Sequence, residues 1–158
     1  MIFVTLGTQD KSFHRLLEMI DKMIDLGIIN DEIIVQAGST KYESNYMQIF
    51  DFIDMDAFSK FVADCDLMIT HAGVGTIING INHGKKIMAV ARREKYGEHE
   101  NDHQVEITTK FSHMGYIVGC LDVNEMIYKF AELKTLKVKP YISNNEAFCA
   151  LIEKFINE

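Results

Sequence analysis

The amino-acid sequence predicts an α/β protein whose sheet is Rossmann-like, doubly wound and mostly parallel. Two observations lead to this fold class. Short apolar runs rich in β-branched residues alternate with segments whose apolar residues recur every three or four positions. Glycine-containing loops separate many of these segments. Such alternation is typical of βαβ units, which build a parallel sheet with helices on both faces. With 158 residues, the chain is expected to form a single domain over residues 1–158.

In the first half of the chain, several predicted elements end at residues that favour turns. The strand Ile2–Leu6 stops at Gly7, and the helix Lys11–Leu26 stops before Gly27, which can cap its C-terminus. The other predicted elements of this half, in chain order, are the strand Glu32–Ala37, the strand Gln48–Ile53, the helix Asp56–Ala63 and the strand Asp66–Thr70.

The second half continues the alternation. The helix Thr76–Asn82 ends near Gly84, and the strand Lys86–Ala91 precedes a charged loop. The remaining predicted elements are the helix Asp102–Met114, the strand Tyr116–Gly119, the helix Asp122–Leu133 and the helix Asn145–Ile156. Ligands of doubly wound sheets bind at the carboxyl ends of the strands, near the point where the strand order reverses. The loops that follow the strands are therefore the expected binding site.

Composition and charge exclude several classes of function. The net charge of −7 disfavours a nucleic-acid partner, which is usually bound through a basic surface. Three dispersed cysteines do not suggest a disulfide framework and favour a reduced, cytoplasmic chain. We expect no signal peptide, and no apolar run approaches the ~20 residues that span a bilayer. Any membrane association is therefore expected to be peripheral or through a partner.

The sharpest segment for chemistry is the glycine loop His71-Ala-Gly-Val-Gly-Thr76, which joins a buried strand to a helix. Its glycines allow a ligand to approach the backbone closely and could supply a positive-φ turn, while the N–H groups of the helix start attract an anion such as a diphosphate. A tight connection that needs glycine for turn geometry alone is the alternative. The loop matches neither the Walker pattern nor the full dinucleotide fingerprint.

A second segment, from Arg92 to Gln104, follows a strand and precedes a helix at the same expected edge of the sheet. Its two arginines could contact phosphate, and its polar residues could reach sugar hydroxyls. A solvated charged loop is the alternative. The string His99-Glu-Asn-Asp-His103 matches H-E-x-x-H, but a zinc site of that type needs both histidines on one continuous helix. Because Asn101-Asp102 are typical of an N-cap, we expect His99 to lie outside the helix and no metal to bind.

Three motifs in this order resemble the C-terminal domains of glycosyltransferase family 28. They are the Ile2–Leu6 run with Gly7-Thr8-Gln9, the His71–Thr76 loop, and Arg92-Arg93-x-Lys-Tyr-Gly-Glu98-His99-x-x-Asp102-His103-Gln104. The chain resembles the short, stand-alone PssE-type proteins of exopolysaccharide synthesis, which are similar to the catalytic subunit of the dolichol-linked GlcNAc transferase and to the C-terminal half of MurG-type enzymes. This resemblance implies one half of a GT-B glycosyltransferase.

The resemblance also implies which residues bind a UDP-sugar donor. Phe52, Ile53 and Met55 resemble the segment that holds the uracil ring, and the His71–Thr76 loop resembles the segment that holds the diphosphate. Asn79 stands where many relatives have a ribose-binding glutamate, and Ala91 stands where they often have proline. The full expected donor-binding set is Gly7, Thr8, Gln9, Phe52, Ile53, Met55, His71, Ala72, Gly73, Gly75, Thr76, Asn79, Arg92, Arg93, Glu98, His99, Asp102, His103 and Gln104.

The implied function is the donor-binding catalytic subunit of a split, inverting hexosyltransferase. It would move a hexose or GlcNAc from a UDP-sugar, without a cofactor, to a lipid-linked acceptor in exopolysaccharide or capsule synthesis. The acceptor half is expected on a membrane-anchored partner, which would hold this chain at the inner face of the membrane. No general base is identified, and His71 and His99 are only fallback candidates. The alternatives are a non-catalytic accessory subunit and another UDP-sugar-binding α/β enzyme, such as an epimerase.

The predicted final helix offers a surface for that partner. Asn145–Ile156 carries four apolar residues on one side, namely Phe148, Leu151, Ile152 and Phe155. The simpler interpretation is that this side packs on the sheet of the same chain. The second interpretation is that part of it docks the membrane-anchored subunit.

Overall fold

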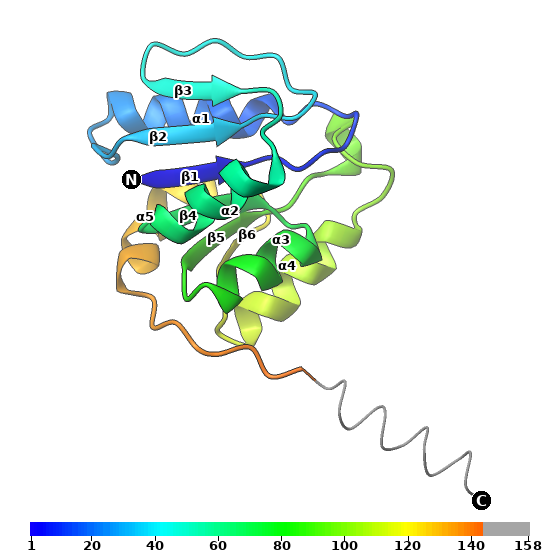
Figure 1. The fold of residues 1–158 in the computed structure, drawn as a ribbon. Helices are drawn as coiled ribbons and strands as arrows, with labels where there is room; N and C mark the ends of the chain where they lie inside the picture. The colour runs from blue at the N-terminus through cyan, green and yellow to red at the C-terminus, as the bar shows by residue number, and fades with distance from the viewer. Residues whose placement is uncertain (144–158) are drawn as a thin grey trace, which may run out of the picture.

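The computed structural model describes residues 1–143, which form one six-stranded, wholly parallel sheet in the order β3-β2-β1-β4-β5-β6 (Figure 1). The strands are β1 (Ile2–Thr5), β2 (Ile33–Gln36), β3 (Met47–Phe50), β4 (Leu67–His71), β5 (Lys86–Val90) and β6 (Val118–Cys120). The predicted α/β class and the doubly wound parallel sheet are confirmed. Every predicted strand up to residue 143 has its counterpart within a few residues.

Helices connect most successive strands of the described residues, although β2 leads to β3 without a helix and one helix follows the last strand. They are α1 (His14–Asp25), α2 (Met55–Asp64), α3 (Val74–Asn82), the short 3-10 helix η1 (Glu94–Tyr96), α4 (His103–His113) and α5 (Glu125–Thr135). The predicted helix Asn145–Ile156 lies outside the described residues. No helix within residues 1–143 combines the length and the apolar character needed to cross a bilayer.

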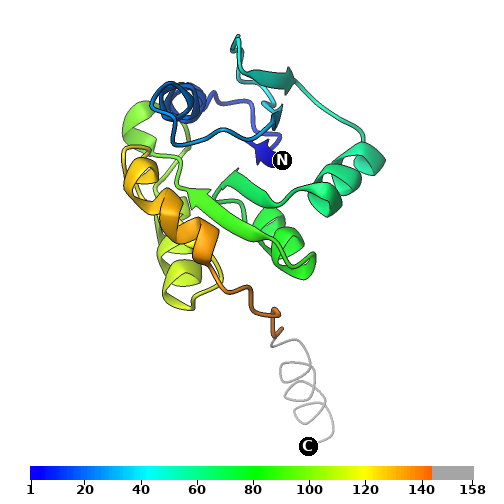
Figure 2. The same cartoon turned by 90° about the vertical axis from the view of Figure 1, so that its left-hand side faces the viewer.

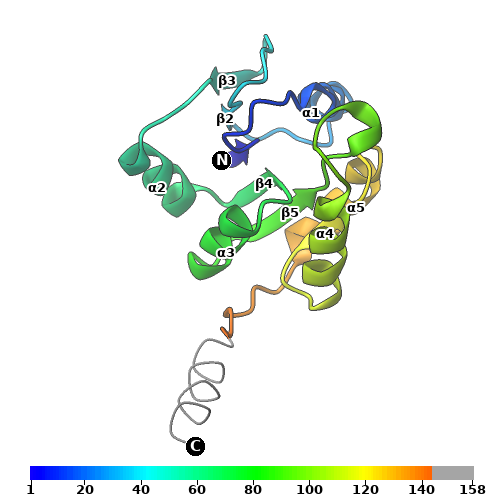
Figure 3. The same cartoon turned by 90° about the vertical axis from the view of Figure 1, so that its right-hand side faces the viewer.

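Two apolar layers hold the helices on opposite faces of the sheet (Figures 2 and 3). Successive side chains of a strand point to opposite faces, so Val4 and Phe3 of β1 join different layers. Val4 packs in the layer under α1 and α5, and Phe3 packs in the layer under α2, α3 and α4. Strands buried on both faces explain why the sequence shows continuous apolar runs rather than strict alternation.

The third strand is shorter than the sequence predicts. The apolar run continues to Ile53, but β3 ends at Phe50. Backbone hydrogen bonds continue a little beyond β2, from the Ala37 N–H to the Phe50 carbonyl and from the Gly38 N–H to the Asp51 carbonyl. Gly38 then has φ +61°, and the chain turns away from β3 there. The segment after Phe50 is therefore free of the sheet and leads to α2, which begins at Met55.

The strand order reverses between β1 and β4. From β1 the chain proceeds outward through β2 and β3, and it then returns to add β4, β5 and β6 on the other side of β1. The connection after β1 therefore leads toward β2, and the connection after β4 leads the opposite way toward β5. An opening remains between these two connections at the carboxyl ends of β1 and β4. Thr5 of β1 lies in register with Thr70 of β4, so the loops that begin at Gly7 and Ala72 face each other across this opening.

Candidate functional site

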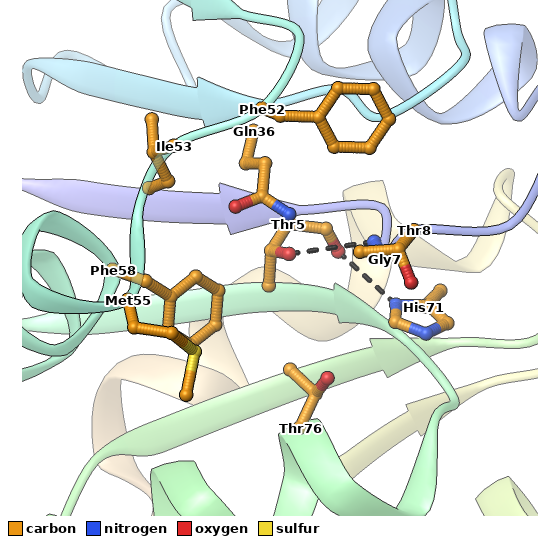
Figure 4. A pocket seen from close by; sticks show the side chains of 10 residues that line it. All are labelled: Thr5, Gly7, Thr8, Gln36, Phe52, Ile53, Met55, Phe58, His71 and Thr76. Atoms are coloured by element: carbon orange, nitrogen blue, oxygen red, sulfur yellow. Dashed lines mark hydrogen bonds between the residues drawn. The ribbon is translucent and has the colours of Figure 1, made fainter.

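A pocket of about 290 Å³ opens at the carboxyl ends of β1, β2 and β4, at the point where the strand order reverses (Figure 4). Its walls come from four separate segments of the chain, and their lining residues are Thr5, Gly7, Thr8, Gln36, Phe52, Ile53, Met55, Phe58, His71 and Thr76. The expectation that the loops after the strands would meet there is confirmed for the loops after β1, β3 and β4.

One end of the pocket is apolar. Phe52 and Ile53 follow β3, and Met55 and Phe58 belong to the first turn of α2. The side chain of Asp54 caps α2 by accepting a hydrogen bond from the Ala57 N–H at 2.7 Å, which fixes the path of the chain between β3 and the helix. Phe52 is 57% exposed and Met55 is 80% exposed, so this end can cover a flat apolar ligand group.

The other end is formed by the start of α3. The helix begins at Val74, and its N-cap Gly73 has no side chain to accept a hydrogen bond. The N–H groups of the first helical turn have no partner within their own helix, and the helix dipole adds a partial positive charge there. Thr76 places its side chain at the pocket wall in the same turn. This end of the pocket is suited to an anion, as the sequence predicts for a diphosphate.

The imidazole of His71 lies between the loops after β1 and β4. A Cβ atom on Gly7 would come within 2.7 Å of its Cε1 and Nε2 atoms, and a Cβ atom on Gly73 would overlap Nε2. Its Nδ1 atom is 3.4 Å from the Thr5 carbonyl oxygen and 3.3 Å from the Thr70 hydroxyl. Burial, together with the charge of Arg92, lowers the pKa of His71 to about 4. The ring is therefore neutral at physiological pH.

The glycines of this pocket serve different geometric purposes. Gly7 has φ +77°, a conformation that residues with a Cβ rarely adopt. Gly73 has φ −78°, so the expected positive-φ turn is not present there. The His71 ring occupies the space that a side chain at position 73 would fill, so any other residue there would displace the ring. The sequence predicts that a ligand approaches the backbone of this loop closely, but at Gly73 the His71 ring occupies that place.

Arg92 has a different role from the one its charge suggests. Its side chain is 1% exposed. Its Nη1 atom donates to the carbonyls of Lys11 (2.8 Å) and Glu98 (3.1 Å), and its Nη2 atom donates to the Leu6 carbonyl (2.7 Å). Burial lowers its pKa to about 10. The structure therefore gives Arg92 an anchoring role between the loops after β1 and β5, in place of the expected phosphate contact.

Glu98 and Gln104 belong to the same anchor. Both are buried, at 3% and 5% exposure. The Glu98 carboxylate accepts two hydrogen bonds from Arg15 of α1, at 2.7 and 3.0 Å, and one from the Arg93 N–H at 3.0 Å. The Gln104 carbonyl oxygen accepts from the Arg92 N–H at 3.1 Å. Glu98 and Gln104 therefore form hydrogen bonds with other buried groups of the protein and do not face a ligand.

The rest of this loop is more open. Arg93 donates to Asp102 at 3.2 Å. The hydrogen bonds that Asp102 accepts, first from the Glu94 N–H and then from Arg93, lower its pKa. His99 precedes α4, whereas His103 is the first residue of that helix. The H-E-x-x-H string therefore lacks the continuous helix that a zinc site requires. Within residues 1–143, no group of three or more His, Cys, Asp or Glu side chains is placed to hold a metal ion.

The pocket brings together only part of the expected residue set. Gly7, Thr8, Phe52, Ile53, Met55, His71 and Thr76 line it. The expected residues that do not line it are Gln9, Ala72, Gly73, Gly75, Asn79, Arg92, Arg93, Glu98, His99, Asp102, His103 and Gln104. Sequence reasoning missed Thr5, Gln36 and Phe58. Thr5 and Gln36 are the last residues of β1 and β2, a position that the rule on strand ends could have identified.

A family model matches almost the whole chain. The model described as "Glycosyltransferase family 28 C-terminal domain" matches residues 1–155. Its extent includes all four segments that line the pocket.

Two relatives with descriptive names are similar in sequence. The "UDP-N-acetylglucosamine transferase subunit ALG13" of Debaryomyces hansenii is 26% identical over 145 residues, which are 92% of this chain and 62% of that protein. The protein of the same name from Saccharomyces cerevisiae is 29% identical over 93 residues, which are 58% of this chain and 44% of that protein. The chain thus spans less than two thirds of the length of either relative.

Solved structures share the fold. The solution structure of ALG13 has a TM-score of 0.59 at 22% identity, with 95% of this chain and 93% of that chain covered. The glycosyltransferase SnogD from Streptomyces nogalater has a TM-score of 0.60 at 14% identity, with 84% of this chain and 34% of that chain covered. The fold is therefore that of one half of a GT-B glycosyltransferase.

Proposed function

Because the chain belongs to the family of glycosyltransferase family 28 C-terminal domains, we propose that it is the donor-binding catalytic subunit of a split glycosyltransferase. Its donor is a UDP-sugar, and the sugar is a hexose or GlcNAc. One observation carries this proposal. A single pocket joins an apolar end, formed by Phe52, Ile53 and Phe58, to the N-terminus of α3 across the point where the strand order reverses. These two ends match the base and the diphosphate of a nucleotide.

The proposed reaction breaks the bond between the anomeric carbon of the sugar and the diphosphate oxygen of UDP. An oxygen of the acceptor forms the new bond from the opposite face, and its proton passes to a general base. Negative charge grows on the departing diphosphate, and the free N–H groups at the start of α3 stabilise that charge. Since Arg92 is bound by protein carbonyls, the helix N-terminus carries most of this electrostatic role.

The general base is proposed to belong to the acceptor half. His71 is a neutral base at physiological pH, but its ring is enclosed between Gly7 and Gly73 and is suited to contact the diphosphate. His99 precedes α4 and lies outside the lining of the pocket. We therefore assign the general base to neither side chain.

The acceptor half is proposed to be a membrane-anchored partner. Two similar proteins are named as transferase subunits, which supports an assembly of more than one chain. The partner would hold this chain at the cytoplasmic face of the membrane, beside a lipid-linked acceptor. Exopolysaccharide or capsule synthesis is the proposed setting. Transfer from a panel of UDP-sugars, measured with membranes that contain or lack the partner, tests the proposal and identifies the sugar.

Uracil nucleotides are expected to stabilise the chain selectively. A ligand that binds only the folded state raises its stability by mass action, by about 2.7 kcal/mol at 100 times Kd. UDP should therefore raise the thermal midpoint in a concentration-dependent way, and ADP and GDP should raise it much less. Thermal unfolding followed by fluorescence measures all three. Equal shifts with UDP, ADP and GDP would show that Phe52 and Ile53 do not form a uracil site.

For the apolar residues within 145–156, which lie outside the described residues, we test the second interpretation, that part of them docks the partner rather than packing on the sheet. Replacing Phe155 with Asp places a charge among apolar interface residues, whose aromatic members often dominate affinity. The variant should lose co-purification with the partner and lose transfer activity, yet bind UDP normally. Lys154→Ala, on the same segment, is the matched control and should keep the partner. Transfer to a lipid acceptor at full rate by the isolated chain would instead rule out the split enzyme.

A further inference from the structure

Gln36 has an unused carboxamide that faces the candidate site. It is the last residue of β2 and is 5% exposed, so 95% of its surface is buried. Within residues 1–143, its side-chain amide has no hydrogen-bond partner, although it lines the pocket. The nitrogen and oxygen of this amide are not among the buried unpaired atoms of the described residues, so they reach the open space of the pocket, where they can bond to water or to a ligand. The rest of the residue is held in the sheet, so its amide is fixed in place with both hydrogen-bonding groups available to a ligand in the pocket.

The position of Gln36 indicates which part of a nucleotide it would meet. In the register of the sheet, Gln36 lies beside Phe50 of β3 and beside Thr5 of β1. Neighbouring strands are about 4.8 Å apart, so Gln36 is next to the segment that follows β3 and two strands, about 10 Å, from β4 and His71. Figure 4 shows its amide between Ile53 and Phe58 on one side and Thr8 and His71 on the other.

We propose that the carboxamide of Gln36 binds the polar edge of the pyrimidine base and takes part in base selection. This inference rests on the proposed function, because it requires a uracil nucleotide in the pocket. The faces of the base would lie among Phe52, Ile53 and Phe58, while its edge points to the end of β2. The diphosphate is then directed to the start of α3.

The chemistry of the two groups is complementary. A carboxamide has one acceptor oxygen and one donor NH₂ group. The uracil edge offers a donor N–H beside an acceptor carbonyl, so Gln36 can form two hydrogen bonds with it. A carboxylate at position 36 could only accept. It would keep the bond to the N–H and would oppose the carbonyl, but it would suit the exocyclic amino group of cytosine.

Two substitutions of Gln36 test the inference by calorimetric binding of UDP, CDP and uridine. Gln36→Leu should weaken UDP and uridine by the same factor, about tenfold, since both carry the base. Gln36→Glu should weaken UDP more than CDP, so that the ratio of their affinities falls about tenfold or more. Gln48→Leu, an exposed glutamine on β3, is the control and should leave all affinities unchanged.

Stability provides an independent measurement. Because Gln36 has no partner in the described protein, Gln36→Leu leaves no buried group unpaired and should not lower the thermal midpoint. Unchanged UDP affinity in Gln36→Leu would overturn the inference. Equal losses for UDP and CDP in Gln36→Glu would assign the contact to ribose or phosphate and would also overturn it. Absence of uracil-nucleotide binding by the wild-type chain is a separate result, which rejects the proposed function itself.

Discussion

Replacing Arg92 with Met is expected to lower the free energy of unfolding by about 3–5 kcal/mol. The guanidinium is 1% exposed and donates to the carbonyls of Leu6, Lys11 and Glu98. Its loss leaves the buried carbonyls of Leu6 and Glu98 and the part-buried carbonyl of Lys11 without this donor, and each buried group left unpaired costs about 1–3 kcal/mol. It also removes a cation–π contact with Phe13, whose ring centroid is 5.0 Å from the guanidinium carbon. Denaturant unfolding measures the change.

Arg93 is the matched control for this prediction. It is adjacent in sequence and has the same charge, but it donates to Asp102 at 3.2 Å near the surface and to the Leu121 carbonyl at 3.3 Å. Arg93→Met should therefore cost about 1 kcal/mol or less. A stable Arg92→Met variant that binds UDP poorly would contradict the anchoring role. That result would support instead the contact between Arg92 and phosphate that the sequence suggests.

Replacing Gly73 with Val is expected to weaken UDP binding about 100-fold, the equivalent of two lost charge-assisted hydrogen bonds. The new Cβ atom would overlap Nε2 of His71 and lie within 3.0 Å of Cε1. Either the ring turns into the pocket or the start of α3 moves. Both outcomes disturb the diphosphate end of the pocket. Beyond its chain neighbours, the atoms nearest the new Cβ atom belong to His71 and not to the apolar core residues around Ala72. Titration with UDP measures the affinity, and thermal unfolding should show a smaller relative loss.

A double-mutant cycle with His71→Ala separates the cause. If Gly73→Val acts through the imidazole, its effect on UDP affinity should be much smaller once the ring is absent, since residues in contact are not additive. Independent, additive effects would show that position 73 acts on the ligand directly. If Gly73→Val folds and binds UDP normally, the loop serves turn geometry alone and does not bind the diphosphate.

The fold could be predicted because the helical and strand periods are both clear in the sequence. The run Ile2–Leu6 is buried at every position, and the period of the segment after it matches α1. Element ends were less accurate where tertiary pairing decides them. The apolar run to Ile53 suggested a longer third strand, but β3 stops at Phe50 because the neighbouring chain turns away at Gly38, whose N–H makes the last bond, to Asp51.

The site could be predicted only where local sequence fixes geometry. The loop from His71 to Thr76 is a strand–glycine–helix connection whose anion-binding end follows from its own residues. The roles of Arg92 and Gln36 depend on residues far away in the sequence. A polar residue inside an apolar run looks like any other strand residue, so the unpaired amide of Gln36 becomes visible only when the ends of β1 and β2 are placed side by side.

The anchor made by Arg92 also has a consequence for the order of folding. Its bonds to Leu6 and Lys11 connect residues 86 and 81 positions apart. Contacts at such separations carry a large loop-closure entropy and are characteristic of slow steps. The loop after β1 therefore gains these bonds only when β5 and its following loop have joined the sheet. In a newly made chain, the bonds to Leu6 and Lys11 therefore cannot form before Arg92 has been synthesised.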